Sequence, residues 1–263
     1  MNWRLWLVVG ALVAVVCAVF LLPPIPQSQS YHNFADQRAL LGIPYCLDVI
    51  SNVPFLIVGV WGVFVVTSQG TSSQTRFVDP REQWSYLVFF VGVALTAFGS
   101  GYYHLRPSDN RLVWDRIPMT IGFMALVAAV ISERVSVKAG VRLLAPLVAL
   151  GIASVSYWNM TESTGHGDLR PYVLVQFGSL VAILLFIALF PPRYTRGADF
   201  LVSLAIYALA KVFEAADRPV FALGGIVSGH TLKHITAAIS AYWILRMLKL
   251  RRPISALTEA AAR

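Results

Sequence analysis

Charged side chains are scarce in this chain of 263 residues. Asp, Glu, Lys and Arg together make up 13% of the sequence, whereas soluble domains carry about 25%. Hydrophobic residues make up 57%, and the mean hydropathy is +0.67. This composition excludes an ordinary soluble domain and indicates an integral membrane protein.

Cysteines are also few, and basic runs with interleaved aromatic residues are missing. The two cysteines, Cys17 and Cys46, lie in or beside apolar sequence, at a spacing typical of neither a disulfide framework nor a metal site. The net charge is +8, but no basic run contains interleaved aromatic residues, so we expect no nucleic-acid partner. The chain has no internal repeat either, which argues against a transporter built from two related halves.

The sequence is dominated by apolar segments of roughly 17 to 22 residues, the length that crosses a hydrocarbon core of about 30 Å as a helix. There are eight, at residues 5–22, 49–67, 85–104, 115–132, 139–157, 171–190, 198–216 and 229–248. Backbone groups in lipid need hydrogen-bond partners within the protein, so each segment is predicted to be helical. We predict an all-α fold, a multi-pass membrane helix bundle with a seven-helix core and one extra N-terminal transmembrane helix.

The core is assigned to residues 31–250, and the two ends of the chain are assigned separately. Residues 1–30 hold the first apolar segment and a Pro-rich linker. That segment follows one positive residue, Arg4, as in a signal peptide. Its apolar run is long for a signal peptide and no clear cleavage site follows, so we expect it to be retained. Residues 251–263 form a short basic tail.

The distribution of Lys and Arg predicts the orientation in the membrane. If the N-terminus is cytoplasmic, 13 of these residues fall on the cytoplasmic side and six on the other side, with two inside segments. Both termini are therefore predicted to be cytoplasmic. The unusual polar residues Asp48, His104, Asp115 and His230 then all lie near the non-cytoplasmic face, where they could form one site.

The histidine spacing suggests a metal site. Ser100 and His104 are four residues apart, as are His230 and His234, so each pair shares one face of a helix. A histidine pair with a third histidine from another helix suits a tetrahedral Zn²⁺ whose fourth position is open to water. We therefore predict that His104, His230 and His234 bind zinc. The alternative is that these histidines only hydrogen-bond between helices and hold the bundle together.

Asp115 and Ser100 are the candidate catalytic residues. Asp115 precedes Arg116, Ile117 and Pro118, so it could be the N-cap of a helix that has proline in its first turn. It could also take a proton from a metal-bound water, and the two roles are compatible. Ser100 could bond back to its own helix, or it could donate to the oxyanion of a tetrahedral intermediate.

Other polar residues in the segments have simpler interpretations. Lys211 and Glu214 are three residues apart and are predicted to form an ion pair, which lowers the cost of burying both. Lys233 is interpreted as a lysine whose charged end extends to the membrane–water interface, or as a residue that supports the metal ligands. His32 and His166 are predicted to lie in outer loops, solvated rather than bound to metal.

The combined pattern resembles the alkaline ceramidases. The residues that carry the resemblance are Ser100 and His104, then Asp115 eleven residues later, then His230 and His234 near the C-terminus. The wider superfamily also contains the adiponectin-type receptors. The resemblance implies an intramembrane zinc amidase in which the three histidines hold the metal, Asp115 acts on the bound water and Ser100 assists at the substrate carbonyl or the metal site. The implied reaction hydrolyses a ceramide-like N-acyl lipid to a fatty acid and a sphingoid base.

The likeness covers residues 48–248, and Asp48 to Asn52 resembles the stretch that opens the family's first core helix. Eukaryotic alkaline ceramidases also carry an acidic cluster that binds calcium before this helix. Here residues 31–38 contain few carboxylates, and Tyr45 replaces an expected acid, which puts a calcium requirement in doubt. The other hypothesis is a seven-helix receptor or lipid sensor with a structural or regulatory zinc. The sequence specifies neither the acyl length nor an oligomeric state.

Overall fold

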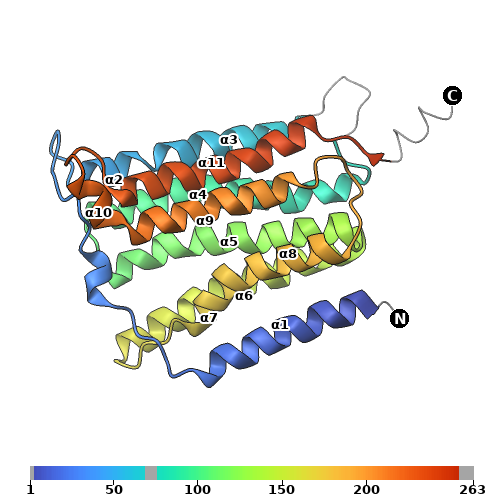
Figure 1. The fold of residues 1–263 in the computed structure, drawn as a ribbon, viewed down its shortest axis with the longest axis horizontal. Helices are drawn as coiled ribbons and strands as arrows, with labels where there is room; N and C mark the ends of the chain where they lie inside the picture. Colours follow the sequence, from blue (N-terminus) through green and yellow to red (C-terminus); the bar gives the residue numbers. More distant parts are fainter. Residues whose placement is uncertain (1–2, 69–75, 255–263) are drawn as a thin grey trace.

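The computed structural model of the protein describes residues 3–68 and 76–254. Within these ranges the chain has helices and no β-strand (Figure 1), which confirms the predicted all-α fold. The predicted tail lies outside the described residues from residue 255 onward. The elements are α1 (Trp3–Leu21), η1 (Gln29–His32), α2 (Cys46–Ile50), α3 (Val53–Thr67), η2 (Pro80–Glu82), α4 (Gln83–Leu105), α5 (Asp109–Arg134), α6 (Val137–Ser163), α7 (Arg170–Val173), the π-helix η3 (Leu174–Gly178), α8 (Ser179–Leu189), α9 (Asp199–Ala215), α10 (Asp217–Ala222) and α11 (Gly229–Leu250).

All eight apolar segments are helical, and most are long enough to cross a membrane. Among the described residues, six helical spans have the required length and hydropathy: Trp3–Leu21, Cys46–Thr67, Pro80–Leu105, Asp109–Arg134, Val137–Ser163 and Arg170–Leu189. These spans indicate an integral membrane protein. Two further long helices differ from them, because α9 has only 17 residues and α11 carries polar side chains in its first two turns.

The helices pack side by side around α5 (Figure 1). α5 is the most buried of the six spans, with 78% of its apolar window inside the protein, whereas the same figure for α1 is 6%. α4 and α6 pack closely along α5, and α8 also contacts it, while α3 follows α4 and is joined by α11 and α9. Ala125, Ala128 and Ala129 are fully buried on α5, and such small side chains let membrane helices approach closely.

The segment that follows α1, residues 22–32, crosses the end of the bundle where α4 ends and α5 begins. We call this segment the strap. The backbone amide of Gln27 donates to the Glu162 carboxylate at 2.9 Å. Arg116 donates to the Gln27 side chain at 2.7 Å, and its guanidinium lies 4.2 Å from the centre of the Trp158 ring. These contacts tie the strap to α5 and α6.

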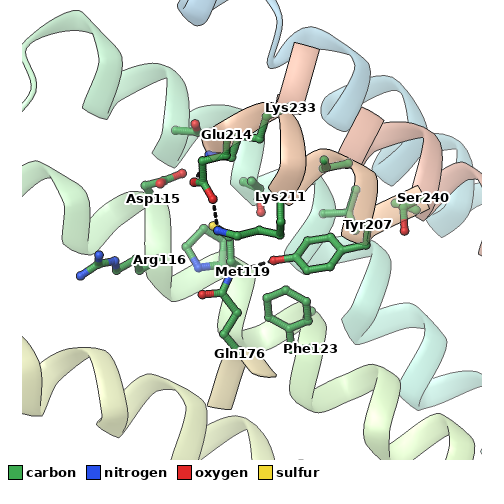
Figure 2. A pocket seen from close by; sticks show the side chains of 18 of the residues that line it. Asp115, Arg116, Met119, Phe123, Gln176, Tyr207, Lys211, Glu214, Lys233 and Ser240 are labelled. Atoms are coloured by element: carbon green, nitrogen blue, oxygen red, sulfur yellow. Dashed lines mark hydrogen bonds and ion pairs between the residues drawn. The ribbon is translucent and has the colours of Figure 1, made fainter. Parts of the chain in front are cut away.

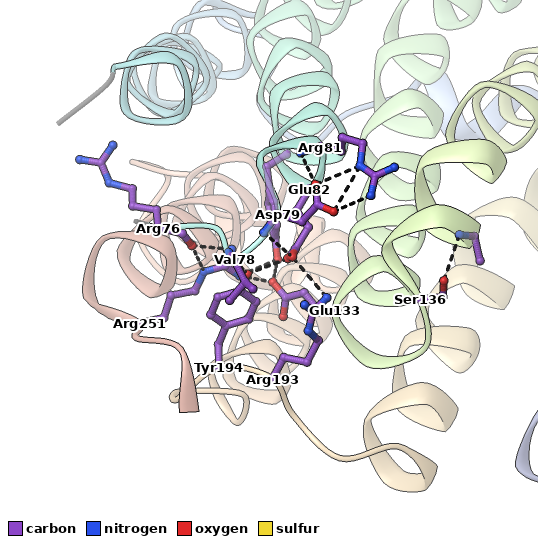
Figure 3. A network of polar contacts seen from close by, with 12 residues as sticks. Arg76, Val78, Asp79, Arg81, Glu82, Glu133, Ser136, Arg193, Tyr194 and Arg251 are labelled. Carbon is purple, nitrogen blue, oxygen red and sulfur yellow. Dashed lines mark hydrogen bonds and ion pairs between the residues drawn. The ribbon is translucent and has the colours of Figure 1, made fainter. Parts of the chain in front are cut away.

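A polar network closes the opposite end of the bundle, where α11 ends (Figure 3). Arg251 donates to the buried Glu133 carboxylate and lies 4.0 Å from the centre of the Tyr194 ring. The Tyr194 hydroxyl donates to Glu82 at 2.9 Å, and Arg193 forms an ion pair with the same carboxylate at 3.3 Å. Each buried acid therefore has a positively charged partner, which limits the cost of burying it.

Candidate metal centre and adjoining cavity

Three histidines meet at the end of the bundle that the strap crosses. His104 lies in the last turn of α4, and His230 and His234 lie in the first two turns of α11. Their ligand nitrogens all lie within 4.8 Å of one another, and the Nε2 atoms of His104 and His230 are 3.2 Å apart. All three side chains are buried. The structure thus brings together the three histidines that the sequence analysis singled out.

The start of α11 is fixed by Ser228. Its hydroxyl accepts a hydrogen bond from the backbone amide of Thr231 at 3.0 Å, the usual role of a serine N-cap. Ser228 and Thr231 also donate to the carboxylate of Asp48, which is buried on α2. This links the first turn of α11 to the turn before α3 and sets the direction in which His230 and His234 project.

Hydrogen bonds also determine which nitrogen of His234 is available to a metal. The Ser51 hydroxyl donates to the backbone carbonyl of Asp48 at 3.1 Å and lies 2.8 Å from His234 Nδ1. Since its proton is used on the carbonyl, the hydroxyl accepts from Nδ1–H. Nε2 is then the His234 nitrogen that carries the lone pair, and the ring centre of His234 lies 4.9 Å from that of His104 and 4.7 Å from that of His230. Partners of this kind orient metal-binding histidines in many sites.

The residues present fit a metal ion. Phe34 packs on the rings of His104 and His230, with ring centres 4.6 and 4.4 Å away, and the Nε2 atoms of these two histidines lie close to each other. A tetrahedral zinc with Zn–N bonds of about 2.05 Å holds two nitrogens about 3.3 Å apart, close to the 3.2 Å between His104 and His230. A buried cluster of three imidazoles could therefore hold one ion.

Ser100 and Asp115 come together because α4 and α5 approach closely beside them. Pro118 has no N–H to bond to the carbonyl of Trp114 one turn earlier. Gly99 lies against that carbonyl, and a Cβ atom at position 99 would overlap its oxygen. The absence of a side chain at this point lets Ser100, the next residue, approach Asp115, the residue after Trp114.

The Ser100 hydroxyl lies 3.5 Å from His234 Nε2 and interacts with the Asp115 carboxylate. Both residues are buried and line the same cavity. The interpretation of Asp115 as a helix N-cap is wrong, because α5 begins earlier, at Asp109, with Ser108 before it. Asp115 therefore lies in the second turn of α5, and its side chain caps no helix.

Two lysines and a glutamate line the cavity next to the histidines (Figure 2). Lys211 and Glu214 form the ion pair that their spacing predicted. Lys233 lies 3.4 Å from the same carboxylate and 3.5 Å from His230 Nε2. The Lys233 side chain faces the cavity. The interpretation of Lys233 as a lysine that extends to the membrane–water interface is therefore wrong. The Tyr31 hydroxyl also donates to Glu214, at 3.3 Å, and burial raises the pKa of Tyr31 well above its usual value.

The other two histidines do not join this group. His166 is exposed, as predicted. His32 is not solvated, because its ring is held between the Tyr103 hydroxyl at 2.8 Å and the Asp109 carboxylate at 3.0 Å. His32 thus fastens the strap to α4 and α5, a role that needed partners from distant parts of the chain and gave no local signal.

A cavity of about 260 Å³ extends from this group into the bundle. Ser100, Asp115 and His234 lie in its wall at one end. On α5 the lining runs from Asp115 to Leu126, which is about 16 Å at 1.5 Å per residue. Most of the deeper lining is apolar, and it includes Phe89, Val93, Phe123, Leu126, Leu180, Leu204 and Ala241. The cavity therefore joins a polar end to a long apolar interior.

Comparisons of the chain with protein-family models, with curated proteins and with solved structures find no match. The assignment of a function consequently depends on the residues and their arrangement. What they support directly is an integral membrane helix bundle with a buried group, His104, His230 and His234, that could hold a metal ion.

Proposed function

We propose that this chain is an intramembrane zinc-dependent amide hydrolase that cleaves a ceramide-like N-acyl lipid to a fatty acid and a sphingoid base. The observation that carries the proposal is the position of the histidine group. It lies beside Ser100 and Asp115 at the polar end of a long apolar cavity. The resemblance of these residues to the alkaline ceramidase motif supports the same reaction.

The roles proposed for the residues follow from their contacts. His104, His230 and His234 would hold zinc, which supplies an activated water and polarises a carbonyl. The Asp115 carboxylate would take the proton of the attacking water and pass it to the leaving amine. Ser100, between Asp115 and His234, would donate a hydrogen bond to the oxygen of the substrate carbonyl.

The shape of the cavity supports a lipid substrate. Its apolar interior matches a hydrocarbon chain, because burying apolar surface stabilises binding by about 25 cal/mol per Å². Asp115 and Ser100 line its polar end, where an amide at the boundary between headgroup and chain would lie. A small amide without a hydrocarbon chain would leave the apolar lining, such as Phe89, Val93 and Leu126, without a matching partner.

The proposal includes a topology. α9 and α11 would complete a seven-helix core, and α1 would be the extra helix, so that eight spans place both termini in the cytoplasm. The excess of Lys and Arg on that side, 13 against six, supports this orientation. The histidines would then lie near the non-cytoplasmic face and Arg251 near the cytoplasmic one, at opposite ends of α11.

Calcium is not part of the proposal. In residues 31–38, where the calcium-binding acids of the family would lie, the carboxylate of Asp36 accepts two hydrogen bonds from the Arg38 guanidinium, each of 2.8 Å. This ion pair holds the pKa of Asp36 below its usual value. A carboxylate engaged in this way is a poor calcium ligand unless Arg38 moves.

The test uses purified protein in detergent, with zinc content measured beside fatty-acid release from a ceramide. The wild type should contain one zinc per chain and release fatty acid. Asp115→Asn should keep the zinc and lose the activity, whereas His234→Ala should lose both. Tyr242→Phe, which alters a tyrosine of α11 outside the cavity lining, serves as the control and should change neither.

The same measurements separate the enzyme from the receptor or lipid sensor. A sensor would bind zinc and lipid but release no fatty acid from any N-acyl lipid in a panel. That result, obtained with zinc-loaded protein, would refute hydrolysis as the function. Absence of zinc from wild-type protein purified without chelators would refute the metal centre itself.

A further inference from the structure

Tyr207 and Gln176 form a polar pair in the largely apolar part of the cavity (Figure 2). Gln176 Nε2 donates to the Tyr207 hydroxyl at 2.7 Å. The Tyr207 ring packs edge-on against Phe123, with ring centres 5.4 Å apart. Gln176 belongs to the π-helix η3, and π-helical turns inside helices occur frequently at functional sites. The pair is therefore held in a defined geometry on two different helices.

The pair does not use all of its hydrogen-bonding groups. Among the residues that the structure describes, nothing accepts the Tyr207 hydroxyl proton and nothing donates to Gln176 Oε1. If the amide of Gln176 were turned over, Tyr207 would donate to Oε1 instead. One lone pair of the tyrosine oxygen and the amide N–H groups would then be free. In either orientation the pair offers both a donor and an acceptor to the cavity.

An apolar cavity is an unfavourable place for unused polar groups. A hydrogen-bonding group left without a partner in such surroundings costs about 1–3 kcal/mol. The ligand that would satisfy this pair is one that accepts from Tyr207 and donates to Gln176 at the same time. A hydroxyl group does both, and a plain hydrocarbon chain does neither.

The charged groups of the cavity lie between the Tyr207–Gln176 pair and the three histidines. Lys211 is one helical turn from Tyr207 on α9, which is about 6 Å, and Lys211 pairs with Glu214 one turn further on. In the other direction along α9, the next polar residue of the lining is Ser203, whose hydroxyl is already bonded to Ser240 at 2.9 Å. Tyr207 and Gln176 thus lie between the charged groups and the apolar interior, and they keep hydrogen-bonding groups that no described neighbour uses.

We infer that Tyr207 and Gln176 form a hydroxyl-binding subsite, so that the preferred ligand is a lipid with a hydroxyl group on a chain that enters the cavity. This inference deepens the proposed function and rests on it for the class of lipid. The hydroxyl can belong to the sphingoid base or to the acyl chain. The chemistry recognised is the same, and the test separates the two sources.

The experiment measures binding in detergent with Asp115→Asn protein, in which the proposed reaction is blocked. Two matched pairs of probes are compared. One pair is an N-acyl sphingoid base against the N-acyl alkylamine of equal length, and the other is a ceramide with a 2-hydroxyacyl chain against one with the plain chain. In at least one pair we expect the hydroxylated lipid to bind roughly tenfold more tightly, the effect of one or two hydrogen bonds. The pair of probes that shows this preference identifies whether the recognised hydroxyl belongs to the sphingoid base or to the acyl chain.

Adding Tyr207→Phe or Gln176→Met to this protein should remove the preference while the plain lipid binds as before, and Tyr242→Phe should leave it unchanged. Equal binding within both pairs would overturn the inference. So would failure of all four probes to bind, or a preference that survives both substitutions. Wild-type protein with the hydroxyl preference but without hydrolysis would refute the proposed function alone. Hydrolysis without the preference would refute only the subsite.

Discussion

Gly99 on α4 lies directly against the carbonyl oxygen of Trp114 on α5, with no space for a Cβ atom between them. The carbonyl is free to face α4 because Pro118, one turn later, cannot donate to it. This contact lies next to both Ser100 and Asp115. The distance between these two candidate catalytic residues is thus set by a proline and a glycine that take no part in the chemistry.

The first prediction concerns this contact. Gly99→Ala should push α4 and α5 apart and lower the free energy of unfolding by about 1–3 kcal/mol, the usual cost of overpacking. It should also lower hydrolysis if Ser100 and Asp115 act together. Gly101→Ala is the matched control, since a Cβ at position 101 meets nothing within 4 Å, and it should be neutral or slightly stabilising. Thermal melting of the two variants in detergent measures the change in stability. Equal melting temperatures for Gly99→Ala and Gly101→Ala would contradict the prediction.

The second prediction concerns Ser51, which the sequence analysis did not identify. Ser51→Ala removes the group that accepts from His234 Nδ1–H, so the ring loses one constraint on its orientation. We expect zinc affinity to fall by about 10- to 100-fold, as when similar partners are removed elsewhere. The measurement is zinc retention against chelators of graded strength.

The control for Ser51 is Ser154→Ala. Ser154 is also a buried serine, but among the described residues its hydroxyl bonds only to the carbonyl of Gly151 on its own helix. This variant should hold zinc as the wild type does. If Ser51→Ala and Ser154→Ala retained zinc equally, the assigned role of Ser51 would be wrong.

The third prediction concerns the polar network at the other end of the bundle. Glu133→Gln leaves the buried Arg251 without its negative partner, and breaking one side of a buried ion pair costs about 3–5 kcal/mol. The melting temperature should fall sharply while zinc content stays unchanged. Asp79→Asn breaks an ion pair with Arg81, whose side chain is 61% exposed, and should cost at most about 1 kcal/mol.

The fourth prediction is a dependence of stability on pH. The Arg170 guanidinium beside Asp168 holds the pKa of that carboxyl below its usual value. The ion pair therefore stabilises the fold above the unfolded pKa of about 3.9, and this contribution is lost as the pH falls through the lower pKa of the folded state. Asp168→Asn should cost about 1–2 kcal/mol at pH 7. The difference from wild type should shrink below pH 4, and a difference that stayed constant with pH would contradict this assignment.

The sequence predicted the helices well because lipid leaves the backbone little choice. It was less successful at the helix ends. Hydropathy marks the part of a helix that lies in the apolar layer, so it missed the polar first turns of α5, residues 109–114. That error made Asp115 look like an N-cap. Ser108 followed by Asp109, an N-cap residue before an acid in the first turn, was the signal that could have corrected it.

The histidine group was predictable because spacing of four residues on a helix and similarity of motif both point to it. The contacts of Lys233, His32 and Ser51 were not, since each depends on a partner from a distant segment: Glu214, Tyr103 and His234 respectively. Pairings of this kind follow from the packing of the bundle, and no local pattern in the sequence encodes them.

Phe34 covers the rings of His104 and His230 from the side of the strap, and this has a consequence for kinetics. An ion held by these histidines could exchange with the solution on that side only when the segment carrying Phe34 lifts away. Loading would then be fastest before this segment docks, during synthesis or insertion. Once folded, the protein should exchange its ion slowly, on the timescale of local unfolding, so zinc and a chelator should need long incubation to reach equilibrium.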